Sequence, residues 1–274
     1  MSVRVGLRLR TPDEAVYLIH VPVDMRAFNR WAGQRGLIRR GSFDPDYALH
    51  ILLSAMFGQR ALQPFRLFWS ERRRSASLYA YTDADQEALQ EVAAVAAPPD
   101  CIAPLNPAAL RSKPMPSTFA DGRRLGFDLR VRPVRRLRRD LHDTQAGAVM
   151  KQGREVDSFR LAVLQRFPDG WRERGDAARQ NGMSRESTYA AWLSERLAGA
   201  ANLEECRLSS FNRSRAVRGD GHGPEGPDAT LHGTLCVQDP TSFSRRLREG
   251  VGRHRAYGYG MMLLRPPNRT ALSK

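Results

Sequence analysis

Residues 44–57 read DPDYALHILLSAMF, and this stretch predicts the amphipathic helix around which the rest of the chain is organised. Asp44 and Pro45 are typical of a helix start, because aspartate caps free backbone amides and proline needs no hydrogen-bond donor in the first turn. Four apolar residues then recur at spacings of three and four, which indicates one buried face. These residues are Leu49, Leu52, Leu53 and Met56.

The same helix places Tyr47 and His50 three residues apart, near its N-terminus. Residues at this spacing lie on one side of a helix, so we expect the phenol and the imidazole to be presented together. Such a pair can transfer protons. A helical histidine can instead be a structural residue that is hydrogen-bonded to a carbonyl, and this stretch alone leaves that alternative open.

Charge and composition indicate a polyanionic partner. The chain has 274 residues, with 44 Lys and Arg against 29 Asp and Glu, which gives a formal net charge of +15. Nearly all of the positive charge is arginine, whose planar guanidinium binds two phosphate oxygens at once and stacks on bases. A chain of this length can also form two domains.

Several functional classes find no support in the sequence. The three cysteines are isolated, with no CxxC or Cys/His cluster, and the glycines match neither a nucleotide-triphosphate loop nor a dinucleotide motif. There is no apolar signal-peptide core and no run of about 18 apolar residues. We therefore expect a reduced, cytoplasmic protein without a metal ion, a cofactor or a membrane attachment.

Hydropathy patterns predict an α+β fold. In the first half, strands are expected at 2–10, 15–23, 65–69 and 76–81, and helices at 24–32, 44–57 and 82–97. This order is most of a βαββαβ unit, the ferredoxin-like arrangement that many RNA-recognition domains share. The proline-rich segment 98–116 has no periodic pattern, so we place a domain boundary there, between domains 1–116 and 117–274.

The second half is predicted to continue this mixture of strands and helices. Strands are expected at 124–133, 202–218, 229–238 and 261–264, and helices at 157–167, 185–197 and 240–248. The segment 219–227 is rich in glycine and proline, which indicates a loop between two strands.

Three groups of residues are candidates for contact with phosphates. They lie in the loop 33–42, in the segment 123–139 with its eight arginines and one acid, and in the glycine run 250–260, whose backbone can approach a ligand closely. A solvated face, or a glycine-rich turn into an edge strand, is the alternative. The candidates are Arg39, Arg40, Arg130, Arg132, Arg135, Arg136, Arg138, Arg139, Gly252, Arg253, His254 and Arg255.

Three motifs together resemble a known family. They are YxxH at residues 47–50, GFDLRVRP at 126–133, and HGTLCVQDP at 232–240 followed by the glycine run to Gly260. In this order they are similar to the CasE branch of the CRISPR repeat endoribonucleases. The resemblance covers both halves of the chain, and the C-terminal glycine pattern is its most specific part.

The resemblance implies two tandem ferredoxin-like domains that bind the stem-loop of a CRISPR repeat RNA and cut just beyond its base. Tyr47 and His50 correspond to the family's catalytic tyrosine and histidine. Other subunits of a multi-subunit CRISPR effector complex are the implied partners. A leading strand, longer inserts in the second domain and the scarcity of lysine are departures from the family. No lysine stands in the second-domain hairpin, where Arg213, Arg215 or Arg218 could replace it; alternation places Arg213 and Arg215 on one face.

The chemistry is also reasonable without the family. Because the sequence has no carboxylate/histidine cluster, the simplest cleavage uses the 2′-hydroxyl of the RNA as nucleophile, leaving a 2′,3′-cyclic phosphate and a 5′-hydroxyl. His50 could be the base or the acid, and arginine would stabilise the phosphoryl charge. Two alternatives stay open: a non-catalytic subunit that holds guide RNA, and a DNA-binding regulator, although no helix-turn-helix or zinc-finger spacing is found.

Overall fold

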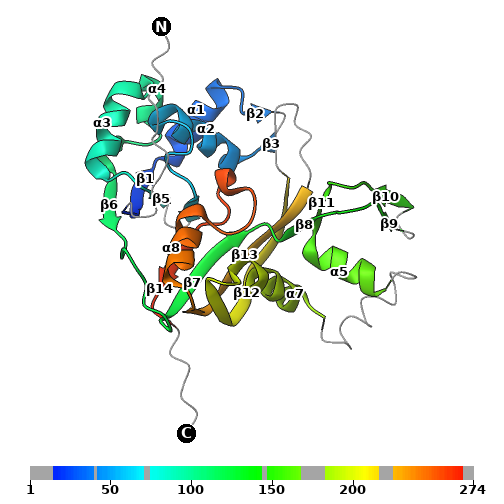
Figure 1. The fold of residues 1–274 in the computed structure, drawn as a ribbon. Helices are drawn as coiled ribbons and strands as arrows, with labels where there is room; N and C mark the ends of the chain where they lie inside the picture. The colour runs from blue at the N-terminus through cyan, green and yellow to red at the C-terminus, as the bar shows by residue number, and fades with distance from the viewer. Residues whose placement is uncertain are drawn as a thin grey trace.

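Two four-stranded antiparallel sheets, each packed against helices, form the body of the chain (Figure 1). The computed structural model describes residues 15–39, 42–70, 75–143, 147–167, 183–215 and 225–267. The strand expected at 2–10 lies outside these ranges. No helix in the described part of the chain is long and apolar enough to cross a membrane.

The first sheet has the strand order β4-β5-β1-β6, and each neighbouring pair is antiparallel. Counted along the chain, these strands take the positions 2-3-1-4, which is the ferredoxin-like arrangement. The main elements are β1 (Tyr17–Val23), α1 (Met25–Gln34), α2 (Pro45–Phe57), β4 (Phe65–Ser70), β5 (Ser75–Thr82), α3 (Gln86–Ala96) and β6 (Arg111–Pro114). Shorter elements are β2 (Ile38–Arg39), β3 (Ser42–Phe43), α4 (Pro99–Ile102) and η1 (Pro107–Ala109).

Helix α2 forms where the sequence predicts it. The Asp44 carboxylate accepts a hydrogen bond from the Tyr47 amide at 3.0 Å, and Pro45 occupies the first turn. Gly58 ends the helix with a φ of 88°, a conformation that favours glycine. Leu49, Leu52, Leu53 and Met56 are all buried in the core of the first half, which confirms the predicted apolar face.

Two segments of the first half differ from their predictions. Strand β6 lies inside the segment that we expected to be patternless, because its residues Arg-Ser-Lys-Pro show no apolar alternation and its strand conformation comes from pairing with β1. The helix expected at 82–97 begins later, at Gln86, because Thr82 still belongs to β5. The cap is Asp85, which accepts a hydrogen bond from Ala88 N at 2.9 Å.

The second sheet repeats the topology of the first. Its order is β12-β13-β7-β14, again 2-3-1-4 along the chain with antiparallel neighbours, so the predicted α+β fold with two tandem ferredoxin-like units is confirmed. We propose that the two units are separate domains with the boundary after residue 116. The elements are β7 (Arg124–Val131), α5 (Ser158–Arg166), α7 (Arg185–Leu197), β12 (Ala201–Arg215), β13 (Glu225–Val237), α8 (Pro240–Glu249), η2 (Arg255–Tyr257) and β14 (Met262–Arg265).

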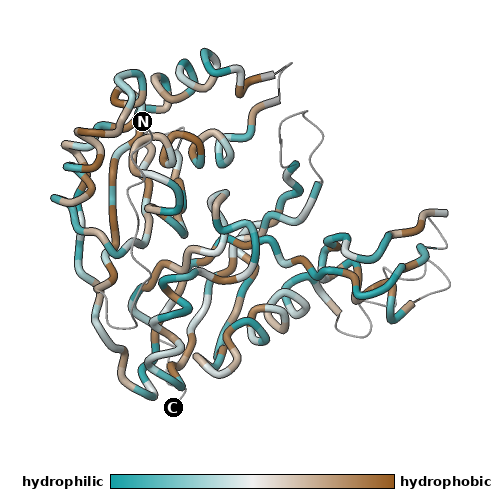
Figure 2. The backbone as a smooth tube through the Cα atoms, turned by 45° about the horizontal axis from the view of Figure 1, so that its top comes forward, coloured by the Kyte–Doolittle hydropathy of each residue, from teal (hydrophilic) through white to brown (hydrophobic). Residues whose placement is uncertain are grey.

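An extension is inserted between β7 and α7, and it projects away from the two sheets (Figures 1 and 2). It contains α5 and four strands of three residues, and a small apolar cluster that includes Met150, Val156 and Leu164 holds it together. The strands are β8 (Val134–Arg136), β9 (Leu141–Asp143), β10 (Ala148–Met150) and β11 (Glu155–Asp157).

Strand β13 begins earlier than predicted. Residues 225–227, expected in a loop, belong to β13, and Arg213 is paired with Pro227 in the ladder. Glycine and proline weaken a strand signal in the sequence, but pairing along this two-stranded ribbon extends it here. Residues 216–224, which include Arg218, lie outside the described residues.

Candidate active site

The two sheets meet through polar side chains. The Tyr81 hydroxyl of β5 donates a hydrogen bond to the Met262 carbonyl of β14 at 2.9 Å. Arg66 of β4 forms a buried ion pair with Asp128 of β7, and Asp128 also lies 2.8 Å from His232 Nε2. These contacts hold the first half against the second. The N-terminal end of α2 therefore faces β7 and the glycine run 250–260, called the glycine-rich turn below.

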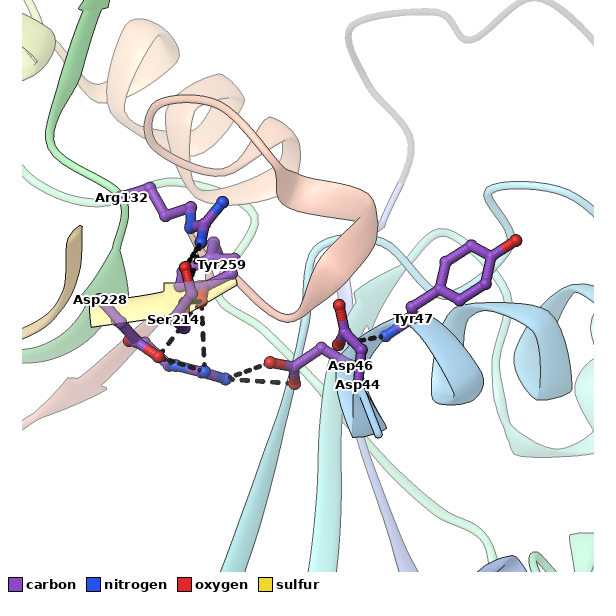
Figure 3. A network of polar contacts seen from close by, with 8 residues as sticks. Asp44, Asp46, Tyr47, Arg132, Ser214, Asp228 and Tyr259 are labelled. Atoms are coloured by element: carbon purple, nitrogen blue, oxygen red, sulfur yellow. Dashed lines mark hydrogen bonds and ion pairs between the residues drawn. The ribbon is translucent and has the colours of Figure 1, made fainter. Parts of the chain in front are cut away.

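Arg130 of β7 joins helix α2 to the second sheet, because it binds both Asp46 and Asp228, which are labelled in Figure 3. Its Nε and Nη2 donate to the Asp228 carboxylate of β13 at 2.9 and 2.6 Å, and its Nη1 lies 2.9 Å from Asp46 Oδ2. The guanidinium carbon also lies 4.5 Å from the centre of the Tyr259 ring. Because Asp46 directly precedes Tyr47, this network fixes the turn of helix that carries the candidate tyrosine.

Arg132 extends the same network toward the hairpin (Figure 3). Its Nη2 donates to the Ser214 hydroxyl at 2.9 Å, and that hydroxyl lies 3.1 Å from the Tyr259 hydroxyl, which in turn donates to Asp228 at 3.2 Å. Burial raises the pKa of Tyr259, so its phenol stays protonated and able to donate. Arg130 and Arg132 therefore use their guanidinium groups largely within the protein.

Asp46 has an unusual electrostatic position, because two carboxylates share the Arg130 guanidinium. Burial raises the pKa of Asp46 to about 6, and the charge of Asp228 acts in the same direction, while Arg130 opposes both. The carboxyl of Asp46 therefore titrates close to neutral pH.

Tyr47 and His50 lie on the same side of α2, as their spacing predicts, and both rings face Tyr257 of η2. The ring centres of His50 and Tyr257 are 5.3 Å apart, and those of Tyr47 and Tyr257 are 6.2 Å apart. His50 is half-buried, and burial lowers the pKa of its imidazole. The neutral imidazole, which can accept a proton, is therefore favoured near pH 7.

A cavity of about 220 Å³ opens beside Tyr47 and Tyr257 and is lined by both halves of the chain. Tyr47 lines it from the first half, and Arg215, His254 and Tyr257 line it from the second. Arg215 is exposed and has no acidic partner within the described residues. His50 is not part of the lining but adjoins it through the Tyr257 ring. Aromatic, cationic and imidazole groups thus meet in one place.

The glycine-rich turn approaches α2 closely because Gly258 has no side chain. Gly258 has a φ of 73°, and a Cβ there would lie 2.7 Å from Asp46 Oδ1. Gly252 packs closely on an aromatic ring, since a Cβ on it would lie 2.9 Å from Trp192, and its contact with phosphate stays a prediction. The backbone at Gly252 therefore packs on α7 and not on the cavity.

The other predicted contact residues are dispersed. Arg213 pairs with Glu225 at 2.8 Å and lines a second cavity of about 590 Å³ between the extension and the hairpin, so it is separated from Arg215. Arg138 and Arg139 are exposed. The side chain of Arg39, and all of Arg40 and Arg218, lie outside the described residues. The remaining arginines contact protein groups: Arg135 with Glu195, Arg136 with Gly153 O, Arg253 with Glu155, and Arg255 with Glu249 O.

Sequence reasoning missed four residues of this site, namely Asp46, Asp228, Tyr257 and Tyr259. A signal for the two tyrosines was present, because they flank a glycine in the run Tyr257-Gly258-Tyr259. Within the described residues, no cluster of three or more His, Cys, Asp or Glu side chains is placed to hold a metal ion.

Solved structures of two CRISPR proteins, Cse3 and Cas6e, are similar to this chain in fold. Cse3 from Thermus thermophilus, in a structure bound to an RNA representing a pre-cleavage complex, superposes with a TM-score of 0.56 at 20% identity, covering 92% of this chain and 100% of Cse3. A structure of the CRISPR endoribonuclease Cse3 with a 19-nt RNA gives the same values. Cas6e from Escherichia coli K-12 gives a TM-score of 0.54 at 17% identity, covering 91% and 99%. At these identities the likeness establishes a shared fold.

A search of curated protein sequences gave no match. A family model described as "CRISPR associated protein" matches residues 16–266, which is most of the chain and spans both sheets. This chain therefore belongs to the CRISPR-associated protein family.

Proposed function

We propose that this chain is an endoribonuclease of the CasE type, which binds the stem-loop of a CRISPR repeat RNA and cleaves at the 3′ base of the stem. One observation carries the proposal: Tyr47 and His50 stand together against Tyr257, beside a cavity lined by Arg215 and His254. The family match, the shared fold with Cse3 and Cas6e, and the net charge of +15 support it.

The reaction uses the 2′-hydroxyl on the 5′ side of the cut. Its oxygen attacks the adjacent phosphorus, the bond from phosphorus to the 5′ oxygen breaks, and the products carry a 2′,3′-cyclic phosphate and a 5′-hydroxyl. His50 takes the 2′ proton, a role that suits an imidazole whose pKa is lowered by burial. Tyr47, one turn earlier on the same face, orients the phosphate.

Arg215 is the cation best placed to stabilise the charge that develops on the phosphoryl oxygens. It lines the cavity and is exposed, whereas Arg130 and Arg132 are held by carboxylates and by Ser214. Arg213, in the neighbouring cavity, contacts the RNA stem. The outlying arginines contribute electrostatic attraction to the phosphate backbone: Arg135, Arg136, Arg138, Arg139, Arg253 and Arg255.

After cleavage the chain keeps hold of the processed RNA and enters a multi-subunit effector complex, as its resemblance to the CasE branch implies. A product that leaves slowly is consistent with a basic surface that contacts many phosphates. Single-turnover behaviour follows from this proposal.

The direct test is to incubate the purified full chain with a 5′-labelled repeat hairpin and to identify the product ends. We expect one shortened fragment that ends in a cyclic phosphate. His142→Ala is a suitable control variant, because His142 is exposed on β9 in the extension. A chain that binds the hairpin but never shortens it would contradict the enzymatic proposal and favour a guide-RNA-binding subunit.

A further inference from the structure

His254 occupies a special place in the glycine-rich turn. It lines the same cavity as Tyr47 and Tyr257, and its backbone has a φ of 62°, in the left-handed region. This conformation is uncommon for a residue with a side chain, and such residues cluster at active sites and ligand-binding turns. The Tyr257 amide donates to the His254 carbonyl at 2.9 Å, so the imidazole and the tyrosine share one tight turn.

A carboxylate from the extension holds this imidazole. Glu155 of β11 places its Oε2 2.7 Å from His254 Nε2, and Arg253 binds the other oxygen of the same carboxylate. The hydrogen bond from His254, aided by Arg253, lowers the pKa of Glu155 to about 2 although burial opposes this. The carboxylate is therefore ionised at all working pH values and holds the imidazole of His254 through Nε2.

The contact with Glu155 also leaves one ring nitrogen of His254 available. Nε2 is bound to Glu155, so the second ring nitrogen, Nδ1, is the one that can contact a substrate. No described residue forms a hydrogen bond with Nδ1. The side chain of His254 is only 12% exposed, so its orientation is fixed by its surroundings. Glu155 binds it, and Tyr47, Arg215 and Tyr257 line the same cavity.

We propose that His254 is the general acid of the cleavage reaction and that Glu155 is its positioning residue. This inference rests on the proposed function, in which His50 takes the proton from the 2′ oxygen. His254 then gives the proton on Nδ1 to the departing 5′ oxygen as the phosphorus–oxygen bond breaks. After product release, His50 returns its proton to water and His254 takes one up, which restores both residues.

The environments of the two histidines differ in the direction that these roles require. His50 has no carboxylate partner among the described residues and is neutral near pH 7 because of burial. His254 is bound to an ionised glutamate. Two titratable groups with opposed environments are the usual structural basis for a separate base and acid.

A modified substrate tests the acid role directly. If the bridging 5′ oxygen at the cut is replaced by sulfur, the leaving thiolate needs no proton, so a variant without the acid should cleave it normally. The variant is His254→Asn, since asparagine tolerates the left-handed backbone. At saturating protein we expect its single-turnover rate on the oxygen substrate to fall about a hundred- to ten-thousand-fold, and its rate on the sulfur substrate to equal that of the wild type.

The outcomes separate this inference from the proposed function. Equal losses on both substrates, or no loss on the oxygen substrate, would overturn the acid assignment while His50→Ala still abolishes cleavage. An active His50→Ala variant would contradict the proposed function itself. His254→Gly is a second variant that keeps the turn if the asparagine variant does not fold.

Glu155→Ala tests the positioning role on the same two substrates. Without the carboxylate, the imidazole of His254 is no longer held through Nε2, so at saturating protein the rate should fall on the oxygen substrate and stay at the wild-type value on the sulfur substrate. Glu195→Ala is the matched control, because Glu195 pairs with Arg135 outside the cavity. A Glu155→Ala variant that cleaves the oxygen substrate at the wild-type rate would remove Glu155 from the mechanism.

Discussion

Asp46 of α2 lies 2.9 Å from Arg130 of β7, and this ion pair connects the helix that carries Tyr47 and His50 to the sheet that carries the cavity. The side chains of Asp46 and Arg130 are only 12% and 21% exposed. The candidate site exists only when the two halves are held together, so the pair is structural support for the proposed chemistry.

Loss of Arg130 should strongly destabilise the protein. In Arg130→Ala, both Asp46 and Asp228 would be left in a largely buried position without their cation. We expect the free energy of unfolding in urea to fall by about 3–5 kcal/mol, the usual cost of breaking a buried ion pair. The control is Arg135→Ala, whose exposed pair with Glu195 should contribute about 0–1 kcal/mol. Equal effects would refute the structural role of Arg130.

Asp46 should make stability depend on pH. Its pKa is raised from 3.8 to about 6 in the folded protein, so between about pH 4 and pH 6 the folded state binds more protons than the unfolded state. The contribution of Asp46 is therefore largest below pH 4 and is lost as the pH rises to about 6. The loss is up to roughly 3 kcal/mol, because each pKa unit corresponds to about 1.4 kcal/mol.

The measurement for Asp46 compares unfolding free energies of the wild type and Asp46→Asn from pH 4 to pH 7. Asparagine resembles the protonated carboxyl and does not titrate, so the wild type should lose stability relative to the variant as the pH rises. Parallel curves would show that Asp46 has an ordinary pKa in the folded state.

His50→Ala should abolish cleavage and leave hairpin affinity within a few-fold. The expectation follows from the position of His50, which adjoins the cavity through the Tyr257 ring and is not part of its lining. Cleavage is followed at saturating protein, and affinity by titration of a labelled 2′-deoxy hairpin. An alanine variant that cuts at nearly the wild-type rate would exclude His50 from proton transfer.

The fold was largely predictable from local patterns, but short strands were not. Helix α2 has both a cap and a complete apolar face, and a strand such as β1 is a run of strand-forming residues next to a turn. The sequence alone therefore specifies them. Strand β6 and the strands of the extension have three or four residues each, and their conformation comes from pairing partners distant in sequence. No local pattern encodes such pairing.

The candidate site was predictable only where its residues are neighbours in the chain. Tyr47 and His50 were identified by their spacing in one helix. Tyr257 reaches them through the glycine turn, which sequence spacing cannot place. The contact of Arg130 with RNA, expected from its arginine-rich segment, stays a prediction, and its pairing with two carboxylates from distant elements was not foreseen. Long-range pairing of charges is not readable from a run of like charges.

Use of the RNA's own 2′-hydroxyl predicts the response to two changes. Cleavage should persist in excess EDTA, because the proposed steps need only side chains and the substrate. It should stop when the nucleotide 5′ of the cut is 2′-deoxy, while binding of that RNA remains normal. Cutting of the deoxy substrate would show that an outside nucleophile attacks the phosphorus.

Arg213 and Arg215 allow a test of catalysis against binding, because the structure separates them. Arg215 lines the cavity beside Tyr47, whereas Arg213 pairs with Glu225 at the neighbouring cavity. Arg215→Ala should slow the cleavage step by about ten- to a thousand-fold, or roughly 1.4–4 kcal/mol, which is typical for loss of one group that stabilises a transition-state charge.

Arg213→Ala should instead weaken binding and reduce the salt dependence by about one phosphate contact, yet cleave at the normal rate once RNA is saturated. Single-turnover rates at saturating protein, measured with the affinity at several salt concentrations, distinguish the two effects. If both variants cleave at the wild-type rate, neither arginine stabilises the transition state. The phosphoryl charge must then be stabilised by another group of the cavity, and Arg132, whose Nη2 is already bound to Ser214, would be the next residue to test.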